Sequence, residues 1–264
     1  MFQRFIDDLK NHYKYAIYSA RAQLKAEVAG SYLNWVWWVL QPFCFMIIYA
    51  IVFGVIFGAK EEYFTAFIFI GITVWDFFNR NVKQSVSLVK KNKAIVTKVY
   101  MPKFILILSK MFVNGFKMLI SFGIVVFLMV VMRVPITWNI LYFIPIIIDL
   151  WLITFGIMCF LTHFGVFVED LSNVLDIFLK FVFYMTGVMY NIDHRIGKTY
   201  PVISAILEKC NPIAYFMKSM RDCLLYSSTP GRKLLGLWFI IAVVISILGV
   251  RLIYKNENSY AKVI

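Results

Sequence analysis

Six apolar stretches alternate with shorter polar segments along the chain. Apolar side chains dominate the ranges 35–58, 63–79, 104–131, 140–166, 171–190 and 234–250. A helix needs about 20 mostly apolar residues to cross the hydrocarbon core of a bilayer. The pattern therefore predicts an all-α integral membrane protein with six transmembrane helices.

Residues 1–34 precede the first apolar stretch and show a different periodicity. Apolar residues such as Phe5, Leu9 and Tyr13 recur at helical spacing, and charged residues such as Arg4 and Lys10 fill the opposite face. This pattern is typical of an amphipathic helix that lies in the membrane interface. A helix packed on a partner protein has the same pattern, and the two interpretations are compatible.

The polar segment 191–233 contains a second amphipathic pattern. Its apolar stripe consists of Ile213, Phe216, Met217, Met220 and Leu224. Lys218, Arg221 and Asp222 lie off this stripe. Asn211-Pro212 precedes it, and proline is favoured in the first turn of a helix. The stripe is too short and too charged to span a bilayer, so we expect a helix that re-enters the membrane or lies on its outer face.

The basic residues predict the orientation. Six spans place both termini on one side, together with the loop 80–103, and that side carries fifteen Lys and Arg residues in its polar segments. The segments of the opposite side carry nine. Because cytoplasmic segments are enriched in basic residues, we expect both termini in the cytoplasm. The chain is then one transmembrane domain, with a cytoplasmic helix (1–34), spans one to five (35–190), an extracytoplasmic segment (191–233), a sixth span (234–250) and a cytoplasmic tail (251–264).

Composition agrees with a membrane protein. Hydrophobic residues make up 61% of the 264 residues and charged residues 16%, with a mean hydropathy of +0.77. Soluble domains are nearer ~45–50% apolar. The net charge of +13 could suggest a nucleic-acid partner, but the basic residues lie mostly between the apolar runs. We therefore expect them to set the membrane orientation and expect no nucleic acid.

The sequence carries no recognisable catalytic or nucleotide-binding motif. The patterns of a P-loop, a G-x-S-x-G nucleophile elbow and an H-E-x-x-H zinc helix do not occur. The three histidines are far apart, and the four cysteines show no metal-binding spacing. Cys210 and Cys223 share one polar segment and could pair, although free thiols are the stronger expectation. We expect no catalytic residue, no metal and no cofactor on this chain.

Charged residues inside the apolar runs are costly and usually face protein or water. They are Lys110, Lys117, Asp149, Asp176 and Lys180. Lys110 and Lys117 are seven residues apart and share one helix face. We expect Asp149 to pair with Lys117, and Asp176 with Lys180 one turn later. These residues either form structural pairs between helices or line a polar conduit.

Aromatic residues recur on two of the predicted spans. The first carries Phe45, Tyr49, Phe53 and Phe57, and the fifth carries Phe178, Phe181 and Tyr184, with Tyr190 at its outer end. Such stripes can face lipid or pack between helices. They can also line a path for a sugar polymer, because aromatic rings offer flat apolar faces to the C–H groups of sugars. The sequence leaves these interpretations open.

Four stretches, in this order, resemble a known family. They are LKAEVAGSYLNWVWWVLQP, GITVWDFFNRNVKQS through VTKVYMPKF, FGVFVEDLSNVLDIFLKFVFYMTGVMY, and NPIAYFMKSMRDCLLY. Their order and spacing, over nearly the whole chain, resemble the permease subunit of polysaccharide-exporting ABC transporters of the type-2 exporter family. One departure is the pair Glu169-Asp170, where the family often has Arg-Asp.

The resemblance implies partners and a substrate. These are a homodimer of permeases, two cytoplasmic ATPase subunits that bind ATP and Mg²⁺, and a glycan or polyol-phosphate polymer on undecaprenyl diphosphate. The polymer would pass along the aromatic residues.

The resemblance also implies a coupling helix between spans two and three and short gate helices between spans five and six. We assign the coupling contact to Lys90, Lys91, Lys93, Ile95, Val96 and Lys98, with Val99 completing a small apolar face. We assign the gate to Asn211, Pro212, Arg221 and Asp222.

Two other classes of function remain as alternatives. A membrane-embedded glycan-lipid transferase would gather carboxylates or histidines near one face, whereas the acidic residues here are dispersed. A secondary transporter would show internal repeats or paired broken helices, and no repeat is visible in the sequence. The expected localisation is the bacterial cytoplasmic membrane. Teichoic acid, O-antigen and capsule all remain open as the polymer.

Overall fold

The computed structural model describes residues 2–30, 32–56, 58, 61–98, 100–197 and 199–263, except the side chains of Phe2, Asn34, Asn258 and 261–263. These residues form helices and short connections, and no strand occurs among them. The long helices are α1 (Phe2–Val28), α2 (Trp37–Tyr49), α3 (Phe64–Val86), α6 (Lys103–Val131), α7 (Phe143–Phe167), α8 (Leu171–Met185) and α11 (Arg232–Val263). The shorter ones are α4 (Leu88–Lys91), α5 (Lys93–Lys98), α9 (Pro201–Cys210) and α10 (Pro212–Leu224). The α2 helix continues as a π-helix over Ala50–Ile56.

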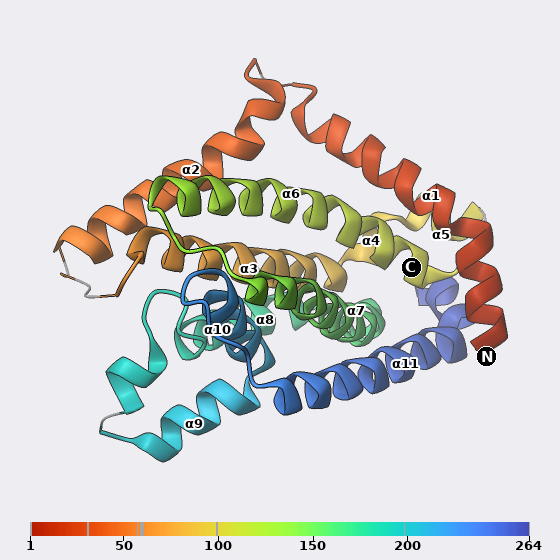
Figure 1. Ribbon diagram of the computed structural model, residues 1–264. Helices are drawn as coiled ribbons and strands as arrows, with labels where there is room; N and C mark the ends of the chain where they lie inside the picture. Colours follow the sequence, from red (N-terminus) through yellow and green to blue (C-terminus); the bar gives the residue numbers. More distant parts are fainter. Residues whose placement is uncertain are drawn as a thin grey trace.

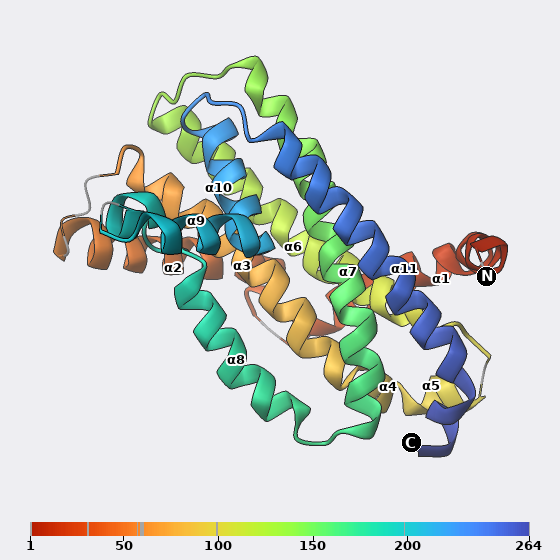
Figure 2. The same cartoon turned by 90° about the horizontal axis from the view of Figure 1, so that it is seen from below.

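The core lies between α3, α6 and α7, which run side by side, with α11 packed along α7 (Figures 1 and 2). Large apolar side chains such as Phe67, Phe77 and Phe104 are fully buried there. The α10 helix is inserted at one end of this bundle and contacts both α3 and α7. That insertion places a short amphipathic helix in the interior of the protein.

The contact between α7 and α11 depends on small residues. A Cβ atom on Gly156 would lie 2.7 Å from Ile245 Cγ2, and one on Gly249 would lie 2.6 Å from Cys159 Cβ. Ser246 Oγ also donates a hydrogen bond of 2.9 Å to the carbonyl of Leu152. Small residues let helix backbones approach closely inside a membrane, where packing rather than hydrophobic exclusion drives helix association.

Four helical segments are long and apolar enough to cross a membrane. They are Trp37–Ile56, Lys103–Val131, Trp138–Phe167 and Arg232–Glu257. They correspond to the predicted first, third, fourth and sixth spans. The predicted second and fifth spans correspond to α3 and α8, and α8 has only 15 residues, about 22 Å at 1.5 Å per residue. The six-span arrangement therefore stays a prediction for α3 and α8.

Some helix boundaries differ from the sequence prediction. The predicted fifth span ran to 190, but α8 ends at Met185, just before Gly187 with its positive φ of 66°. The α11 helix continues to Val263 through the predicted tail, and α3 continues to Val86. The predicted helix within 1–34 is confirmed as α1.

Both ends of the chain lie at the end of the bundle that carries α4 and α5 (Figure 2). Arg4 of α1 donates hydrogen bonds to Tyr100, at 2.5 Å, and to Glu257 of α11, at 2.6 Å. Tyr254 donates a hydrogen bond of 2.6 Å to Asp8. The two termini and the basic segment 88–98 thus share one end of the molecule, as six spans require.

Candidate functional site

The α10 helix begins at the expected residues. Asn211 is its N-cap, and its Oδ1 accepts hydrogen bonds from the amides of Ile213, at 3.1 Å, and Ala214, at 3.4 Å. Pro212 follows in the first turn, where its missing N–H costs nothing. Asn211 Nδ2 also donates to Thr186 Oγ1 at 3.0 Å. The cap therefore fastens α10 to the end of α8.

The apolar stripe of α10 is confirmed as a buried face. Ile213, Phe216, Met217, Met220 and Leu224 are all buried. Arg221, which the sequence places off this stripe, is buried as well. Helical periodicity missed it because the residue sits where the neighbouring backbone, rather than water, accepts its hydrogen bonds.

Arg221 binds three backbone carbonyls from two other segments. Its Nε donates to Phe67 at 3.1 Å, its Nη1 to Gly187 at 3.0 Å and its Nη2 to Val188 at 2.7 Å. Gly71 makes room for it, since a Cβ there would lie 2.4 Å from Arg221 Nη2. The guanidinium thus joins α10 to α3 and to the turn after α8. We call this arrangement the Arg221 clamp.

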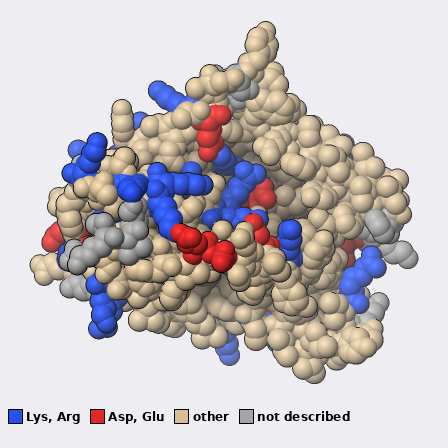
Figure 3. Space-filling model, turned by 180° about the vertical axis from the view of Figure 1, so that it is seen from behind, with Lys and Arg blue, Asp and Glu red and all other residues tan. Residues whose placement is uncertain are grey.

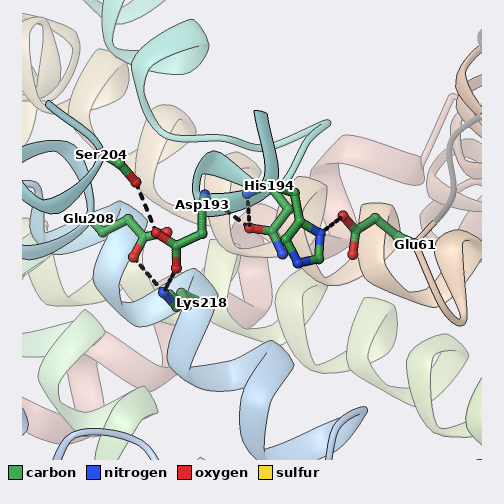
Figure 4. Close-up of polar contacts among 7 residues, drawn as sticks. Glu61, Asp193, His194, Ser204, Glu208 and Lys218 are labelled. Carbon is green, nitrogen blue, oxygen red and sulfur yellow. Dashed lines mark hydrogen bonds and ion pairs between the residues drawn. The ribbon is translucent and has the colours of Figure 1, made fainter. Parts of the chain in front are cut away.

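A polar cluster lies near the clamp, since Lys218 and Glu208 line the same small pocket as Arg221. Figure 4 shows the cluster itself. Lys218 of α10 forms ion pairs with Asp193, at 2.5 Å, and with Glu208 of α9. Ser204 donates a hydrogen bond of 2.9 Å to Asp193. His194 contacts Glu61, just before α3, at 2.5 Å between Nδ1 and Oε1. The cluster connects the segment 193–208 to α10 and to the start of α3.

Charge and burial compete within this cluster. Burial acts to raise the pKa of Asp193, but hydrogen bonds from Lys218 and Ser204 outweigh it, and that pKa lies below its ordinary value. For Glu208, burial prevails over Lys218 and raises the pKa. Burial acts to lower the pKa of Lys218, yet its two carboxylate partners leave that pKa raised. Lys218 therefore stays charged while it holds two acids together.

Lys110 and Lys117 share one face of α6, as expected, and that face meets α1. Lys110 Nζ donates to Gln23 Oε1 at 3.0 Å, and Lys117 forms an ion pair of 2.5 Å with Glu27. The predicted pairing of Asp149 with Lys117 is wrong, because Lys117 faces α1 instead. Asp149 is buried, and its Oδ2 has no hydrogen-bond partner among the described residues.

The predicted ion pair between Asp176 and Lys180 is also wrong. Asp176 of α8 pairs with Lys83 of α3 at 2.6 Å, and Lys180 is exposed. The sequence alone favoured the neighbour one turn away, whereas the packed helices bring Lys83 closer. This ion pair ties α8 to α3 at the end of the bundle opposite the Arg221 clamp.

A cavity of about 410 Å³ lies between α2, α3, α6 and the end of α1. Because charged and polar groups interrupt its largely apolar wall, we call it the polar cavity. Its lining includes the Glu27–Lys117 pair and an Asp76–Arg80 pair of 3.3 Å. Figure 3 shows charged side chains of both signs gathered beside a hollow on one face of the molecule.

Buried polar groups also line this cavity. Thr73 Oγ1 and Asn114 Oδ1 have no hydrogen-bond partner among the described residues. Asn114 Nδ2 donates to Asn81, at 2.9 Å, and to Gln84, at 3.0 Å. Sequence reasoning missed these residues, although the polar positions 76–84 that follow an apolar run were a signal for them.

The aromatic residues of the first predicted span form a continuous stripe on α2. The ring centroids of Phe45 and Tyr49 are 6.3 Å apart, and those of Tyr49 and Phe53 are 6.4 Å apart. Phe45 also lines the polar cavity. Phe57, the fourth predicted member, lies outside the described residues.

The aromatic residues of α8 form a separate stripe. Phe178, Phe181 and Tyr184 are between 55% and 69% exposed. Tyr190 donates a hydrogen bond of 2.6 Å to the carbonyl of Tyr184. These rings do not pack into the core of this chain. They are therefore available for contact with lipid, with a partner subunit or with a substrate.

The basic segment forms the two short helices α4 and α5. Lys91, Lys93 and Lys98 are exposed, and Lys90 lies 3.9 Å from Glu169. Val96 is only 7% exposed, and Ile95 packs against the same core. The apolar part of the expected coupling contact therefore faces this chain, and Val99 lies outside the described residues. The lysines provide the outward surface.

Comparisons with known proteins agree with these features. A family model described as "ABC-2 type transporter" matches residues 18–225. An O-antigen export system permease protein RfbA of Klebsiella pneumoniae is 25% identical over 91% of each chain. Another of that name from Myxococcus xanthus is 24% identical over 72% of this chain and 73% of its own.

The family match begins within α1 and runs to the end of α10, and it includes the Arg221 clamp, the polar cavity and the aromatic stripes. The relatives are permeases, which are transport components rather than enzymes. The apolar helices give the chain the character of a transmembrane protein. The chain therefore belongs to the ABC-2 type transporter family.

Proposed function

We propose that this chain is the permease subunit of an ATP-driven exporter for an undecaprenyl-diphosphate-linked polysaccharide of the teichoic acid, O-antigen or capsule type. The observation that carries this proposal is the similarity to O-antigen export permeases over 91% of both chains. A match of that extent includes the membrane helices and the α9–α10 segment together.

The working assembly is a homodimer with two cytoplasmic ATPase subunits, which bind ATP and Mg²⁺. It lies in the bacterial cytoplasmic membrane, with both termini in the cytoplasm and α9–α10 near the outer face. The exposed lysines Lys91, Lys93 and Lys98 of α4 and α5 contact the ATPase. Closure of the ATPases pushes on this segment, which is continuous with α3 and α6.

Within the dimer, the aromatic stripes of α2 and α8 line the path of the polymer. Phe45 and the α8 rings Phe178, Phe181 and Tyr184 are exposed in the single chain, which supports this role. Tyr49 and Phe53 are partly buried against the core and would present only part of their rings to the path. The Arg221 clamp holds the gate helix α10 against α3. A movement of α3 is therefore transmitted to the outer end of the path.

Depletion of the chain in its own bacterium tests this function. We expect polymer to disappear from the cell surface and undecaprenyl-linked polymer to accumulate inside, as radiolabelled lipid-linked material. Restoring the chain should reverse both changes. Normal surface polymer after complete depletion would contradict the proposal.

A further inference from the structure

A second cavity lies at the end of the bundle that carries the termini. It occupies about 510 Å³ between α1, α4–α5 and α6. Its polar lining consists of Ser19, Gln23, Gln84, Lys91, Asn92 and Lys110. We call it the α1 cavity. No carboxylate lines it within the described part of the chain, which distinguishes it from the polar cavity, whose lining includes Asp76 and Glu27.

The two lysines of the α1 cavity have no acidic partner among the described residues. Lys110 is half-buried, and its Nζ meets only the neutral Gln23 Oε1, at 3.0 Å. Lys91 stands exposed at the rim and forms no ion pair there. The nearby carboxylates are already engaged, since Glu27 pairs with Lys117 and Glu169 with Lys90.

Neutral donors complete the lining. Gln23 Nε2 points at two hydroxyls, those of Ser19 and Ser109, each at 3.3 Å, which are long contacts for such a donor. A half-buried ammonium group whose only hydrogen-bond acceptor is a neutral amide oxygen would be stabilised by a bound anion. Hydrogen bonds that involve an ionised group are about twice as strong as those between neutral groups. The α1 cavity is therefore suited to an anion.

The position of α1 indicates where the anion comes from. The side of α1 that faces away from the protein carries Tyr13, Ile17 and Tyr18, all exposed. Exposed tyrosines beside an aliphatic residue are typical of a helix lying at the level of the lipid headgroups. The wall of the α1 cavity is then itself an interfacial helix, and basic pockets beside transmembrane helices bind anionic headgroups.

We propose that the α1 cavity binds the phosphate-bearing headgroup of an anionic membrane phospholipid, with Lys91 and Lys110 as its ligands. The bound lipid fills the space between α1 and the α4–α5 segment, and so braces the segment that we assign to the ATPase contact. The bracing role rests on the ATPase contact proposed above, whereas lipid binding in the α1 cavity holds for any exported polymer.

Lipid titration of the full-length chain, purified in detergent, tests this. Native mass spectrometry would count bound phosphatidylglycerol, with zwitterionic phosphatidylcholine as the comparison. We expect Lys91→Gln/Lys110→Gln to bind phosphatidylglycerol at least tenfold more weakly than the parent. The matched control is Lys93→Gln/Lys98→Gln, which removes the same charge from exposed lysines of the same segment and should bind within twofold of the parent.

The single variant Lys91→Gln separates loss of the site from misfolding, because this side chain is exposed and its replacement should leave the fold intact. We expect it to weaken phosphatidylglycerol binding severalfold. Equal losses in the two double variants would mean that only overall charge matters and would overturn the site. Unchanged binding in Lys91→Gln/Lys110→Gln would do the same. Displacement of phosphatidylglycerol by millimolar inorganic phosphate or diphosphate would assign the cavity to a soluble anion and overturn the lipid.

Discussion

The guanidinium carbon of Arg221 lies 3.5 Å from the centre of the Phe67 ring. The same guanidinium donates a hydrogen bond to the backbone carbonyl of Phe67. Phe67 of α3 therefore contacts the planar face of the guanidinium with its ring and the edge with its carbonyl. Arginine suits this place because its planar group can stack on a ring while its N–H groups bind carbonyls in several directions. The α10 helix is thereby joined to α3 by a geometry that lysine cannot reproduce.

Replacement of Arg221 should therefore destabilise the protein even when the charge is kept. Lysine carries one nitrogen where arginine carries three, so Arg221→Lys cannot serve all three carbonyls, and each buried carbonyl left without a donor costs about 1–3 kcal/mol. We expect a loss of roughly 2–4 kcal/mol, seen as a lower thermal unfolding temperature in detergent. The control Arg195→Lys alters an exposed arginine and should be nearly neutral.

Gly71→Ala provides an independent check of the same clamp. Its new methyl would lie 2.4 Å from Arg221 Nη2 and 2.7 Å from the carbonyl of Val188. Gly123→Ala is the matched control on α6, because nothing lies within 4 Å of its Cβ position. We expect Gly71→Ala to lower the unfolding temperature and Gly123→Ala to leave it unchanged. If Gly71→Ala were as neutral as the control, the clamp would not restrain α10.

Lys218→Met should destabilise the α9–α10 region in a pH-dependent way. In the folded protein the pKa of Asp193 is lowered, so its contribution is present above its unfolded pKa and is lost as pH falls through the lowered value. Without Lys218 the two acids repel each other at neutral pH, and protonation at acidic pH relieves the repulsion. The deficit relative to the parent, measured by thermal unfolding, should shrink as pH falls.

The double variant Lys218→Met/Asp193→Asn tests the repulsion between the two acids directly, because it differs from Lys218→Met only in the charge of residue 193. Removal of one of the two charges should restore part of the stability at neutral pH. A deficit that is the same at acidic and neutral pH would mean that the repulsion between the two acids does not cause it.

The aromatic stripes predict an export defect without an assembly defect. Tyr49→Ala and Tyr184→Ala should each slow export severalfold, because each removes one apolar surface along the path, while co-purification with the ATPase stays intact. Tyr49→Phe should export normally. Ile48→Ala shortens the neighbouring side chain of α2, which is exposed, and is the matched control. Normal export by both tyrosine variants would mean that the rings only face lipid or pack.

Charge reversal in α5 tests the coupling contact. Lys93→Glu/Lys98→Glu changes two exposed side chains, so membrane insertion should be unaffected. We expect ATPase turnover that no longer drives export, measured as surface polymer per ATP hydrolysed. If the variant inserted in the reverse orientation instead, the lysines would act only as a topology signal.

The hydrophobic pattern predicted the helices well because length and periodicity are local properties. It located α1, α6, α7 and the start of α10 at Pro212 within a few residues. It failed where a partner comes from a distant segment. Asp176 meets Lys83, and Lys117 meets Glu27, only after the helices have packed.

The burial of Arg221 has the same origin. A charged residue in an amphipathic helix is expected in water, and only the carbonyls of α3 and of the turn after α8 reverse that expectation. Gly71 and Gly187 were the available signals, since glycine marks close approach and positive φ. Neither glycine could have been assigned to Arg221 before the packing of α10 against α3 was known.

Transport in inverted membrane vesicles tests the central claim most directly. Vesicles that contain the chain and its ATPase would be loaded with radiolabelled undecaprenyl-linked polymer in the outer, formerly cytoplasmic, leaflet. We predict ATP-dependent protection of the polymer from an added glycan hydrolase, absent without either subunit and without Mg²⁺. Protection that proceeds in the absence of ATP, or of this chain, would contradict the account.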